Sequence, residues 1–348
     1  MNFEKLIDLG KRVYNGKMIE EKDKEGNITL SDEKDIKALC KKVFNDGSVT
    51  PDPSLLHNFN NIIVKLAEEV AQPRVTEFMN ILANYQKANR GDVVLYRTQP
   101  KDKVDWAWSA LGSGIDFIRI SPNTKQIPAI GKPMHFGAYY EPLDMVKNSV
   151  EAFRKAVNDL ADAKVELYYT KIMETIRQAV ADTTIPSNQI KTGTNLPLKD
   201  YRGLEDRMIR LSGSRPILVG DFLLVNHFAD QQATDAVYSK LITDKVKESL
   251  LADLNITAFS RTVAFNINNP WIDLQNTKVK FNPSEGFMFA GGTKNQSPIN
   301  VTEFGQMMQD TRTTFEDERV LLKVTLEADI TLISGRNIAY IKDDSIKA

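Results

Sequence analysis

Residues 143–181 read LDMVKNSVEAFRKAVNDLADAKVELYYTKIMETIRQAVA, without a glycine or a proline. Apolar residues recur at helical spacing, first at Leu143, Val146, Val150, Phe153, Val157 and Leu160, and then, one step shifted, at Val165, Tyr168, Ile172, Ile176 and Val180. This period predicts one helix with a single apolar face. At 1.5 Å per residue the helix is roughly 60 Å long. We therefore expect it to lie along a large sheet, a second helix or an extended molecule.

The composition is that of an ordinary globular protein. The 348 residues are 42% hydrophobic and 26% charged, and 45 Lys and Arg against 46 Asp and Glu leave a formal charge of −1. A dedicated DNA-coating protein is usually clearly basic, so this balance argues against that class. The single cysteine, Cys40, excludes an internal disulfide. With no signal peptide and no run near the roughly 20 apolar residues of a membrane span, we expect a soluble intracellular protein.

Residues 1–90 have the periodicity of helices. Ser31 is the expected N-cap of one helix, and Pro53 is expected near the start of a longer one. Pro73 interrupts the apolar stripe of that second helix, which predicts a kink or a break. The stripe resumes after Pro73 and runs on to Tyr85.

Extended sequence takes over at Arg90. Residues 93–98, VVLYRT, are a candidate strand, and residues 105–121, DWAWSALGSGIDFIRIS, predict two extended segments around a glycine-rich turn. An isolated hairpin is marginal in water, so this segment needs support from its own domain or from a neighbouring molecule. Aromatic side chains are enriched at protein contacts. The candidate contact residues are Trp106, Trp108, Leu111, Ile115 and Phe117.

The second half of the chain mixes helix and strand. Gly213 should end a helix that starts near residue 203, residues 217–220 predict a buried strand, and residues 234–254 predict another helix. The clearest strand covers residues 320–332, where apolar and polar side chains alternate. Its apolar face consists of Val320, Leu322, Val324, Leu326, Ile330 and Leu332. A turn at Ser334-Gly335 and a short last strand follow.

Residues that could carry chemistry are few. His57, His135 and His227 are far apart in the sequence, and none has the spacing of a metal site. Cys40 falls on the apolar face of a short helix, where it is expected to act as a small core residue. The sequence contains neither a phosphate-binding loop nor a nucleophile elbow. We therefore predict no catalytic residues, no cofactor and no metal.

The order of these parts resembles the major capsid protein of tailed bacteriophages, the Hong Kong 97-type fold. In that family an extension loop precedes a long spine helix, a compact axial domain follows, and the chain returns to the peripheral domain as a β ribbon. Residues 105–137 look like the extension loop, 143–180 like the spine helix, 215–292 like the axial domain and 319–343 like the ribbon. The family lacks a short invariant motif, so the resemblance rests on architecture.

The resemblance implies an α+β fold with a defined division of the chain. The expected parts are an N-terminal helical arm (1–90), an extended hairpin like the extension loop (91–139), the spine helix and following loop of the peripheral domain (140–202), an axial domain (203–318) and a C-terminal β ribbon of the peripheral domain (319–348).

The implied function is structural and not enzymatic. Copies of the chain would form the hexamers and pentamers of an icosahedral head shell, with packaged double-stranded DNA touched only non-specifically and no membrane contact. A scaffolding protein, a portal and decoration proteins are the further partners that the resemblance suggests. The location would be the virion capsid, assembled in the host cytoplasm. A near-neutral charge fits a protein whose many copies must not repel one another.

Two alternatives remain open. An encapsulin-like compartment shell uses the same fold to hold cargo enzymes, but such proteins tend to be shorter and lack the long N-terminal helical region. An α/β enzyme with an unrecognised site would need a convergent pocket of His, Asp or Glu residues, for which the sequence offers no pattern.

Overall fold

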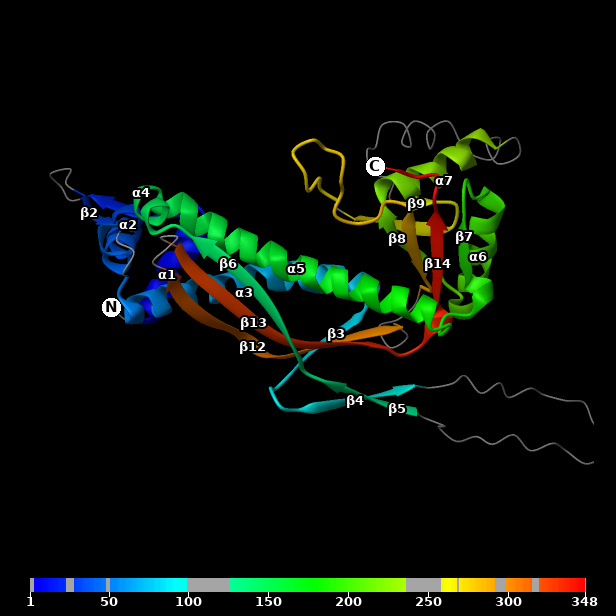
Figure 1. Ribbon diagram of the computed structural model, residues 1–348, viewed down its shortest axis with the longest axis horizontal. Coiled ribbons are helices and arrows are strands. Elements are labelled where there is room, and N and C mark those ends of the chain that lie inside the picture. The colour runs from blue at the N-terminus through cyan, green and yellow to red at the C-terminus, as the bar shows by residue number, and fades with distance from the viewer. Residues whose placement is uncertain are drawn as a thin grey trace, which may run out of the picture.

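The computed structural model describes residues 3–22, 28–47, 51–98, 125–235, 258–267, 269–291, 298–314 and 319–347. The described part is elongated along helix α5, with α1, α2 and α4 at one end, α3 alongside α5 and a six-stranded sheet at the other end (Figure 1). The described α-helices are α1 (Phe3–Tyr14), α2 (Asp32–Val43), α3 (Pro53–Leu82), α4 (Pro142–Lys147), α5 (Ser149–Ala181), α6 (Leu198–Ser212) and α7 (Phe222–Thr234).

The strands form four sheets. A pair β1–β2, a pair β4–β5, a four-stranded sheet β3-β12-β13-β6 and a six-stranded sheet β7-β14-β11-β8-β10-β9 are present in the described residues. The strands are β1 (Glu20–Lys22), β2 (Ile28–Ser31), β3 (Asn84–Ala88), β4 (Val93–Thr98), β5 (Lys125–Ile130), β6 (Lys132–Tyr140), β7 (Ile190–Gly193), β8 (Ile217–Asp221), β9 (Ala258–Phe259), β10 (Thr262–Ile267), β11 (Glu285–Phe289), β12 (Ile299–Thr314), β13 (Arg319–Leu332) and β14 (Ile338–Asp343).

The four-stranded sheet carries the alternation that the sequence predicts. In β13 the even-numbered residues from Val320 to Leu326 are buried, and Leu321 and Lys323 between them are exposed. Residues on the buried face belong to one apolar core with α3 and α5. The predicted packing of this strand against the long helix is therefore confirmed, and two helices, not one, cover the sheet.

The predicted long helix is correct from residue 149 onward but starts later than expected. Asn148 has φ −120° and ψ 47°, which separates α4 from α5. Its N–H donates to Asp144 O at 3.0 Å and its C=O accepts from Ala152 N at 2.9 Å, so it ends one helix and begins the next. Asparagine competes for backbone hydrogen bonds and favours such positions. The uninterrupted α5 is therefore about 50 Å long.

The predicted apolar stripe is confirmed for most of α5. Its buried members are Phe153, Val157, Leu160, Tyr168, Ile172 and Ile176. Leu143, in α4, is 48% exposed, so the expectation for that residue is wrong.

The predicted break at Pro73 is wrong, because α3 runs through it from Pro53 to Leu82. Proline inside a helix costs about 3 kcal/mol or more. Here Pro73 faces solvent, while Ala71 and Val75 on either side are buried in the core. Burial of the stripe on both sides holds the helix together across the missing hydrogen bond. The stripe does not continue as helix to Tyr85, which lies in β3.

The other helix signals of the first 90 residues are borne out. The Ser31 hydroxyl caps α2 by accepting from Lys34 N at 3.4 Å, and Pro53 is the first residue of α3. The β1–β2 pair next to Ser31 was not expected.

The six-stranded sheet is buried on both faces. Along β11, Phe287 and Phe289 join the core that contains α5, whereas Met288 joins a second core with α6 and α7. The same alternation is found in β14, where Tyr340 faces the α5 side and Ile341 faces α6 and α7. The sheet thus lies between the end of α5 and these two helices.

The two large sheets interleave in the sequence. β12 lies within the interval 203–318, yet it pairs with β13 and β3 of the four-stranded sheet. β14 follows β13 by only a short turn, yet it pairs with β11 and β7 of the six-stranded sheet.

β7 lies in a stretch that was expected to be a loop. Gly213 ends α6 with φ 70°, as predicted. Residues 236–257 lie outside the described part, and they include most of the helix predicted at residues 234–254.

Candidate assembly surface

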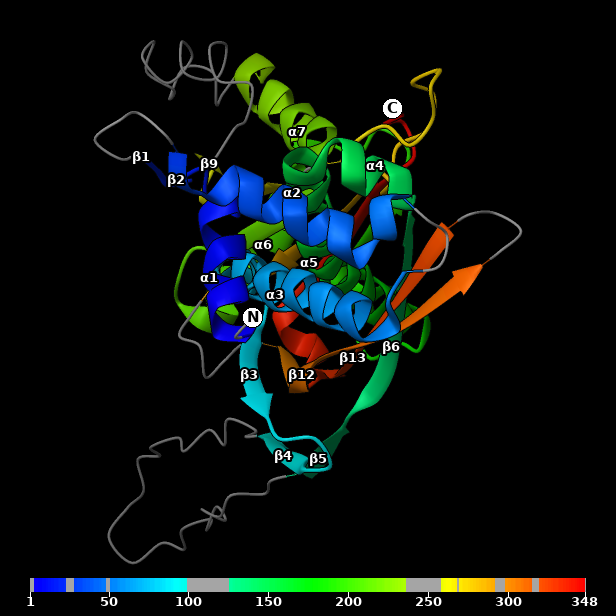
Figure 2. The same ribbon diagram turned by 90° about the vertical axis from the view of Figure 1, so that its left-hand side faces the viewer.

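The β4–β5 pair forms a two-stranded ribbon that projects from the side of the body opposite to α7 (Figures 1 and 2). The strands pair antiparallel from Val93 opposite Ile130 to Thr98 opposite Lys125. The predicted strand at residues 93–98 is therefore confirmed. The candidate contact residues Trp106, Trp108, Leu111, Ile115 and Phe117 fall between the two strands and lie outside the described residues.

The inner face of the ribbon is anchored on the four-stranded sheet. Tyr96 and Ala129 are buried with Phe304 of β12 in a small apolar cluster. The Tyr96 hydroxyl hydrogen-bonds the hydroxyl of Thr302, and Gln86 Nε2 donates to the same Tyr96 oxygen at 2.8 Å. The ribbon is therefore attached to the body by buried side chains.

The outer face of the ribbon is apolar and uncovered in the described chain. Val93, Leu95 and Ile130 are 56%, 55% and 55% exposed. Val93 lies directly opposite Ile130, and Leu95 lies directly opposite Pro128, so the four side chains form one row. This row was not predicted from the sequence. Its signal is the run VVLY, which is apolar at successive positions and so predicts a strand covered on both faces.

Two ion pairs hold the base of the ribbon against β13. Arg90 Nε lies 3.0 Å from Glu327 Oε1, and Lys132 Nζ lies 3.1 Å from Asp329 Oδ1. Asp329 also accepts from the backbone N–H of Ile130 at 3.2 Å. Partly exposed ion pairs contribute little to stability, so their main effect is to fix the direction in which the ribbon leaves the body.

A buried carboxylate joins the sheet to the spine helix close to this base. Glu303 of β12 is fully buried. It accepts from Lys164 Nζ at 3.0 Å and from the hydroxyls of Tyr168 and Tyr85 at 2.6 and 2.7 Å. We call these four side chains the Glu303 junction. Because they come from β12, α5 and β3, they fix the helix, the sheet and the strand that leads to the ribbon relative to one another.

The electrostatics of the junction favour the ionised acid. Burial raises the pKa of Glu303, but the charge of Lys164 and the hydrogen bonds from Tyr168 and Tyr85 outweigh it, so this pKa lies below its ordinary value. Burial and the nearby Glu303 charge raise the pKa of both tyrosines, so they remain hydroxyl donors. The junction is thus a charge pair with every partner in place, which is the condition for a buried charge to be tolerated.

The side chains considered for chemistry are dispersed. The three histidines lie on three separate elements. The backbone oxygen of His57 accepts a hydrogen bond from Gln309. The side chain of His135 hydrogen-bonds Thr325, and that of His227 hydrogen-bonds Gln231. Burial raises the pKa of the Cys40 thiol to about 11, so its thiolate is disfavoured. Within the described ranges, no three His, Cys, Asp or Glu side chains are arranged to hold a metal ion.

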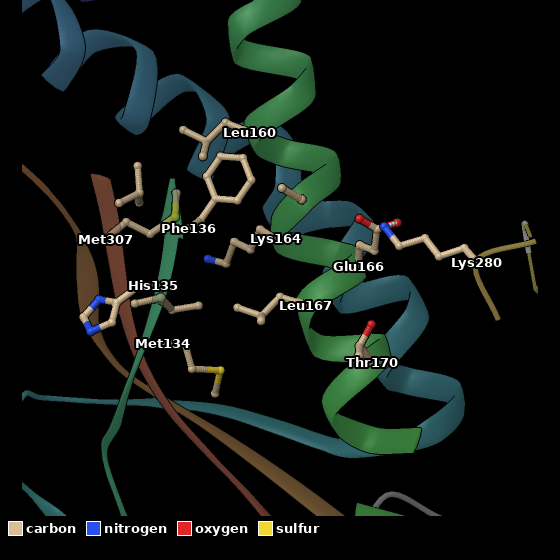
Figure 3. A pocket seen from close by; sticks show the side chains of 13 residues that line it. Met134, His135, Phe136, Leu160, Lys164, Glu166, Leu167, Thr170, Lys280 and Met307 are labelled. Atoms are coloured by element: carbon tan, nitrogen blue, oxygen red, sulfur yellow. Dashed lines mark ion pairs between the residues drawn. The ribbon is translucent and has the colours of Figure 1, made fainter. Parts of the chain in front are cut away.

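A cavity of about 250 Å³ lies between α5 and the four-stranded sheet (Figure 3). Its wall is mainly apolar, formed by Met134, Phe136, Leu160, Leu167, Val324 and Leu326. None of the described helices combines the length and apolarity that a membrane span requires.

Comparisons with known proteins identify the family of this chain. A family model described as "SPbeta prophage-derived putative capsid protein YonB" matches residues 5–342. YonB of the SPbeta prophage in Bacillus subtilis (strain 168) is 41% identical over 341 residues, which cover 98% of this chain and 97% of that protein.

Solved capsid structures are similar at low sequence identity. A chain in the asymmetric unit of the mature capsid of bacteriophage PhiM1 has a TM-score of 0.48 at 9% identity, covering 77% of this chain and 87% of that chain. The capsid protein of cyanophage P-SCSP1u has a TM-score of 0.48 at 8% identity, covering 77% and 88%. The α+β class and the phage-capsid family expected from the sequence are confirmed. The chain belongs to the YonB family of prophage capsid proteins.

Proposed function

We propose that copies of this chain assemble into the closed icosahedral shell of a phage head around double-stranded DNA. The observation that carries this proposal is the outer row of the ribbon, Val93, Leu95, Pro128 and Ile130. A two-stranded ribbon is marginal on its own, and an apolar row on its free face is unfavourable in water. A neighbouring copy that covers this row would remove it from solvent.

The contact is proposed to continue into the segment that the two strands enclose. In the sequence, the proposed contact residues follow β4 and precede β5; they are Trp106, Trp108, Leu111, Ile115 and Phe117. With those side chains included, the area that one chain buries against its neighbours should exceed the roughly 1,600 Å² of a standard interface.

We further propose a division of labour within the subunit. The spine helix with the four-stranded sheet forms the peripheral part, which carries the ribbon, and the six-stranded sheet with α6 and α7 forms the axial part around which hexamers and pentamers close. This division follows the pairing of the strands. It assigns β12 to the peripheral part and β14 to the axial part, although their positions in the sequence would suggest the opposite.

The role is structural, with the completed capsid in the virion and assembly in the host cytoplasm. A formal charge of −1 supports a shell wall that touches packaged DNA only non-specifically. A portal, a scaffolding protein and decoration proteins are the partners that such a shell would use.

Electron microscopy of the purified full chain tests the proposal. We expect closed particles of uniform size at high protein concentration. A chain that stays monomeric at every concentration and ionic strength would contradict it. Particles isolated from the natural source should contain nuclease-protected double-stranded DNA, whereas a protein cargo in place of DNA would favour the encapsulin-like alternative.

A further inference from the structure

The cavity beside α5 departs from the close packing of an ordinary core. Protein interiors contain few voids larger than one water molecule. This cavity has a volume of about 250 Å³, and its wall is mainly apolar. Apolar atoms that line a hole lose the contacts that a packed neighbour would supply. A hole of this size and chemistry therefore suits an occupant that the described part of the chain does not provide.

The helix side of the cavity contains one small residue between larger ones. Leu160, Ala163 and Leu167 line it at spacings of three and four residues, so they share one face of α5. Ala163 leaves space that a larger side chain would fill. Lys164 lies on the same face, but its Nζ is held 3.0 Å from Glu303 Oε1 and does not fill the space.

The sheet side of the cavity is formed mainly by two neighbouring strands. Met134 lies directly opposite Leu326, and Phe136 lies directly opposite Val324, in the β6–β13 pairing. Alternate residues of a strand share one face of the sheet, and Met134 and Phe136 extend from β6 toward α5 (Figure 3). Met307 of β12 adds a second methionine to the wall. Methionine is unbranched and flexible, so it adapts to the shape of an apolar partner.

The charged side chains of the wall are already paired within the subunit. Lys164 pairs with Glu303, and Lys280 forms an ion pair with Glu166. The third basic group, the His135 ring, hydrogen-bonds a threonine hydroxyl of β13 at 3.1 Å. A charged ligand would lose its hydration in the cavity without gaining a free counter-ion. The wall therefore selects an uncharged ligand.

We propose that this cavity is a binding site for an uncharged apolar molecule of about ten carbon atoms. An apolar cavity of roughly 150 Å³ holds benzene, so about 250 Å³ suits a molecule of the size of naphthalene. The bound molecule would contact α5 and the four-stranded sheet at once and so stabilise the packing between them. This site goes beyond the proposed shell function, because the unassembled chain should already bind.

Naphthalene is the probe for the first test. It should bind the unassembled full chain saturably, with a Kd of about 10⁻⁴ M or tighter. Of the ten methionine methyl signals in NMR spectra, those of Met134 and Met307 should shift most. Naphthalene-2-carboxylate has the same rings and a charge, so it should bind at least about tenfold more weakly. Binding that does not saturate, shifts at other methionines only, or equal affinity for the two probes would overturn the proposal.

Filling the cavity is the second test. Ala163→Leu and Ala163→Phe should each lower the affinity for naphthalene about tenfold or more, because the added side chain occupies the space. The smaller change keeps the test decisive if the larger one does not fold. The matched control is Ala181→Leu, at the exposed last residue of α5, which should bind like the parent. Parent-like binding by a folded Ala163→Leu chain would show that the ligand lies elsewhere.

Assembled particles separate this site from an interface between copies. Naphthalene should bind to particles as tightly as it binds to the unassembled chain. Loss of binding on assembly, with a neighbouring copy's side chain seated in the cavity, would overturn the proposal and leave the proposed shell function intact. Failure of the parent chain to assemble would contradict the shell function alone, because binding is measured on the unassembled chain.

Discussion

The Glu303 junction and the β4–β5 ribbon lie close together, yet they differ in how many of their side chains have contact partners within one chain. Every polar group of the Glu303 carboxylate has a partner within the chain, at distances of 2.6 to 3.0 Å. The outer row of the ribbon has three side chains that are more than half exposed. The junction is complete in the subunit, whereas we propose that the outer row of the ribbon is covered by another molecule. Stability of the subunit and assembly of the shell are therefore separable by mutation.

Lys164→Met should have the largest effect on the subunit. It removes the buried cation from Glu303 and leaves the partly exposed Lys87, whose Nζ lies 3.7 Å from Glu303 Oε1, so the loss of unfolding free energy should reach about 3–5 kcal/mol. The matched control is Lys171→Met on the same helix, whose ion pair with Glu174 is exposed and should change stability by less than about 0.5 kcal/mol. Denaturant unfolding of the monomer measures both. Equal losses in the two variants would show that the junction is not the stabilising contact described here.

Val324→Asp should come next. The side chain faces α5 from β13 and is 3% exposed, so a carboxylate there has no partner and should cost roughly 3 kcal/mol. Lys323→Asp, on the exposed face of the same strand, is the control and should stay near the parent value. A Val324→Asp chain that gives soluble, assembled shells at the parent yield would count against the packing of helix on sheet.

Acid should weaken the Glu303 junction. The depressed pKa of Glu303 contributes stability that is present above the unfolded-state value of about 4.3 and is lost as the pH falls through the folded-state pKa. The unfolding free energy of the parent should therefore fall below about pH 4. Glu303→Gln, measured over the same range, should show a shallower decline. Identical pH profiles would remove Glu303 from the acid response.

Leu95→Lys should leave the subunit intact and prevent assembly. The Leu95 side chain is 55% exposed, so the monomer should lose no more than about 0.5 kcal/mol. In the shell the added charge would be desolvated against a neighbour. Light scattering for assembly and thermal melting for the monomer are measured together. Normal shells from Leu95→Lys would mean that this row is not an interface.

The weakest interaction is expected between the unassembled chain and duplex DNA. With a formal charge of −1, the unassembled chain should bind duplex DNA no more tightly than about 10⁻⁴ M near physiological salt, with a shallow salt dependence. Titration against a labelled duplex at two salt concentrations measures this. Sub-micromolar binding with a steep salt slope would reveal a basic face and reopen a nucleic-acid-binding role.

Local patterns predicted much of the fold. The stripe of α5, the alternation of β13 and the Ser31 cap follow from side-chain period and from hydrogen bonding over a few residues. The break at Asn148 was not predicted, although asparagine favours helix ends. At Pro73 the helix continues instead of breaking, because the apolar residues on either side are buried. The pairings of β12 with β3 and of β14 with β11 join distant segments, which local patterns cannot specify.

The candidate site was predictable only in part. The expectation that residues 105–121 are extended sequence in need of support stays a prediction, since they lie outside the described residues. Glu303 occupies a position of β12 where the alternation predicts an apolar residue, which indicates a buried acid. Its partner Lys164 is 139 residues away in the sequence, so local patterns could not predict the pair. The sequence VVLY indicates the two members of the row in β4, Val93 and Leu95, but not their pairing with Ile130 and Pro128.

The central claim is that the outer row of the ribbon is covered by a second copy in the shell. Cryo-electron microscopy of assembled particles, at a resolution that traces side chains, measures this directly. The account predicts that Val93, Leu95 and Ile130 are buried against an adjacent subunit. The same side chains exposed to solvent in the shell, or packed on their own chain, would contradict it.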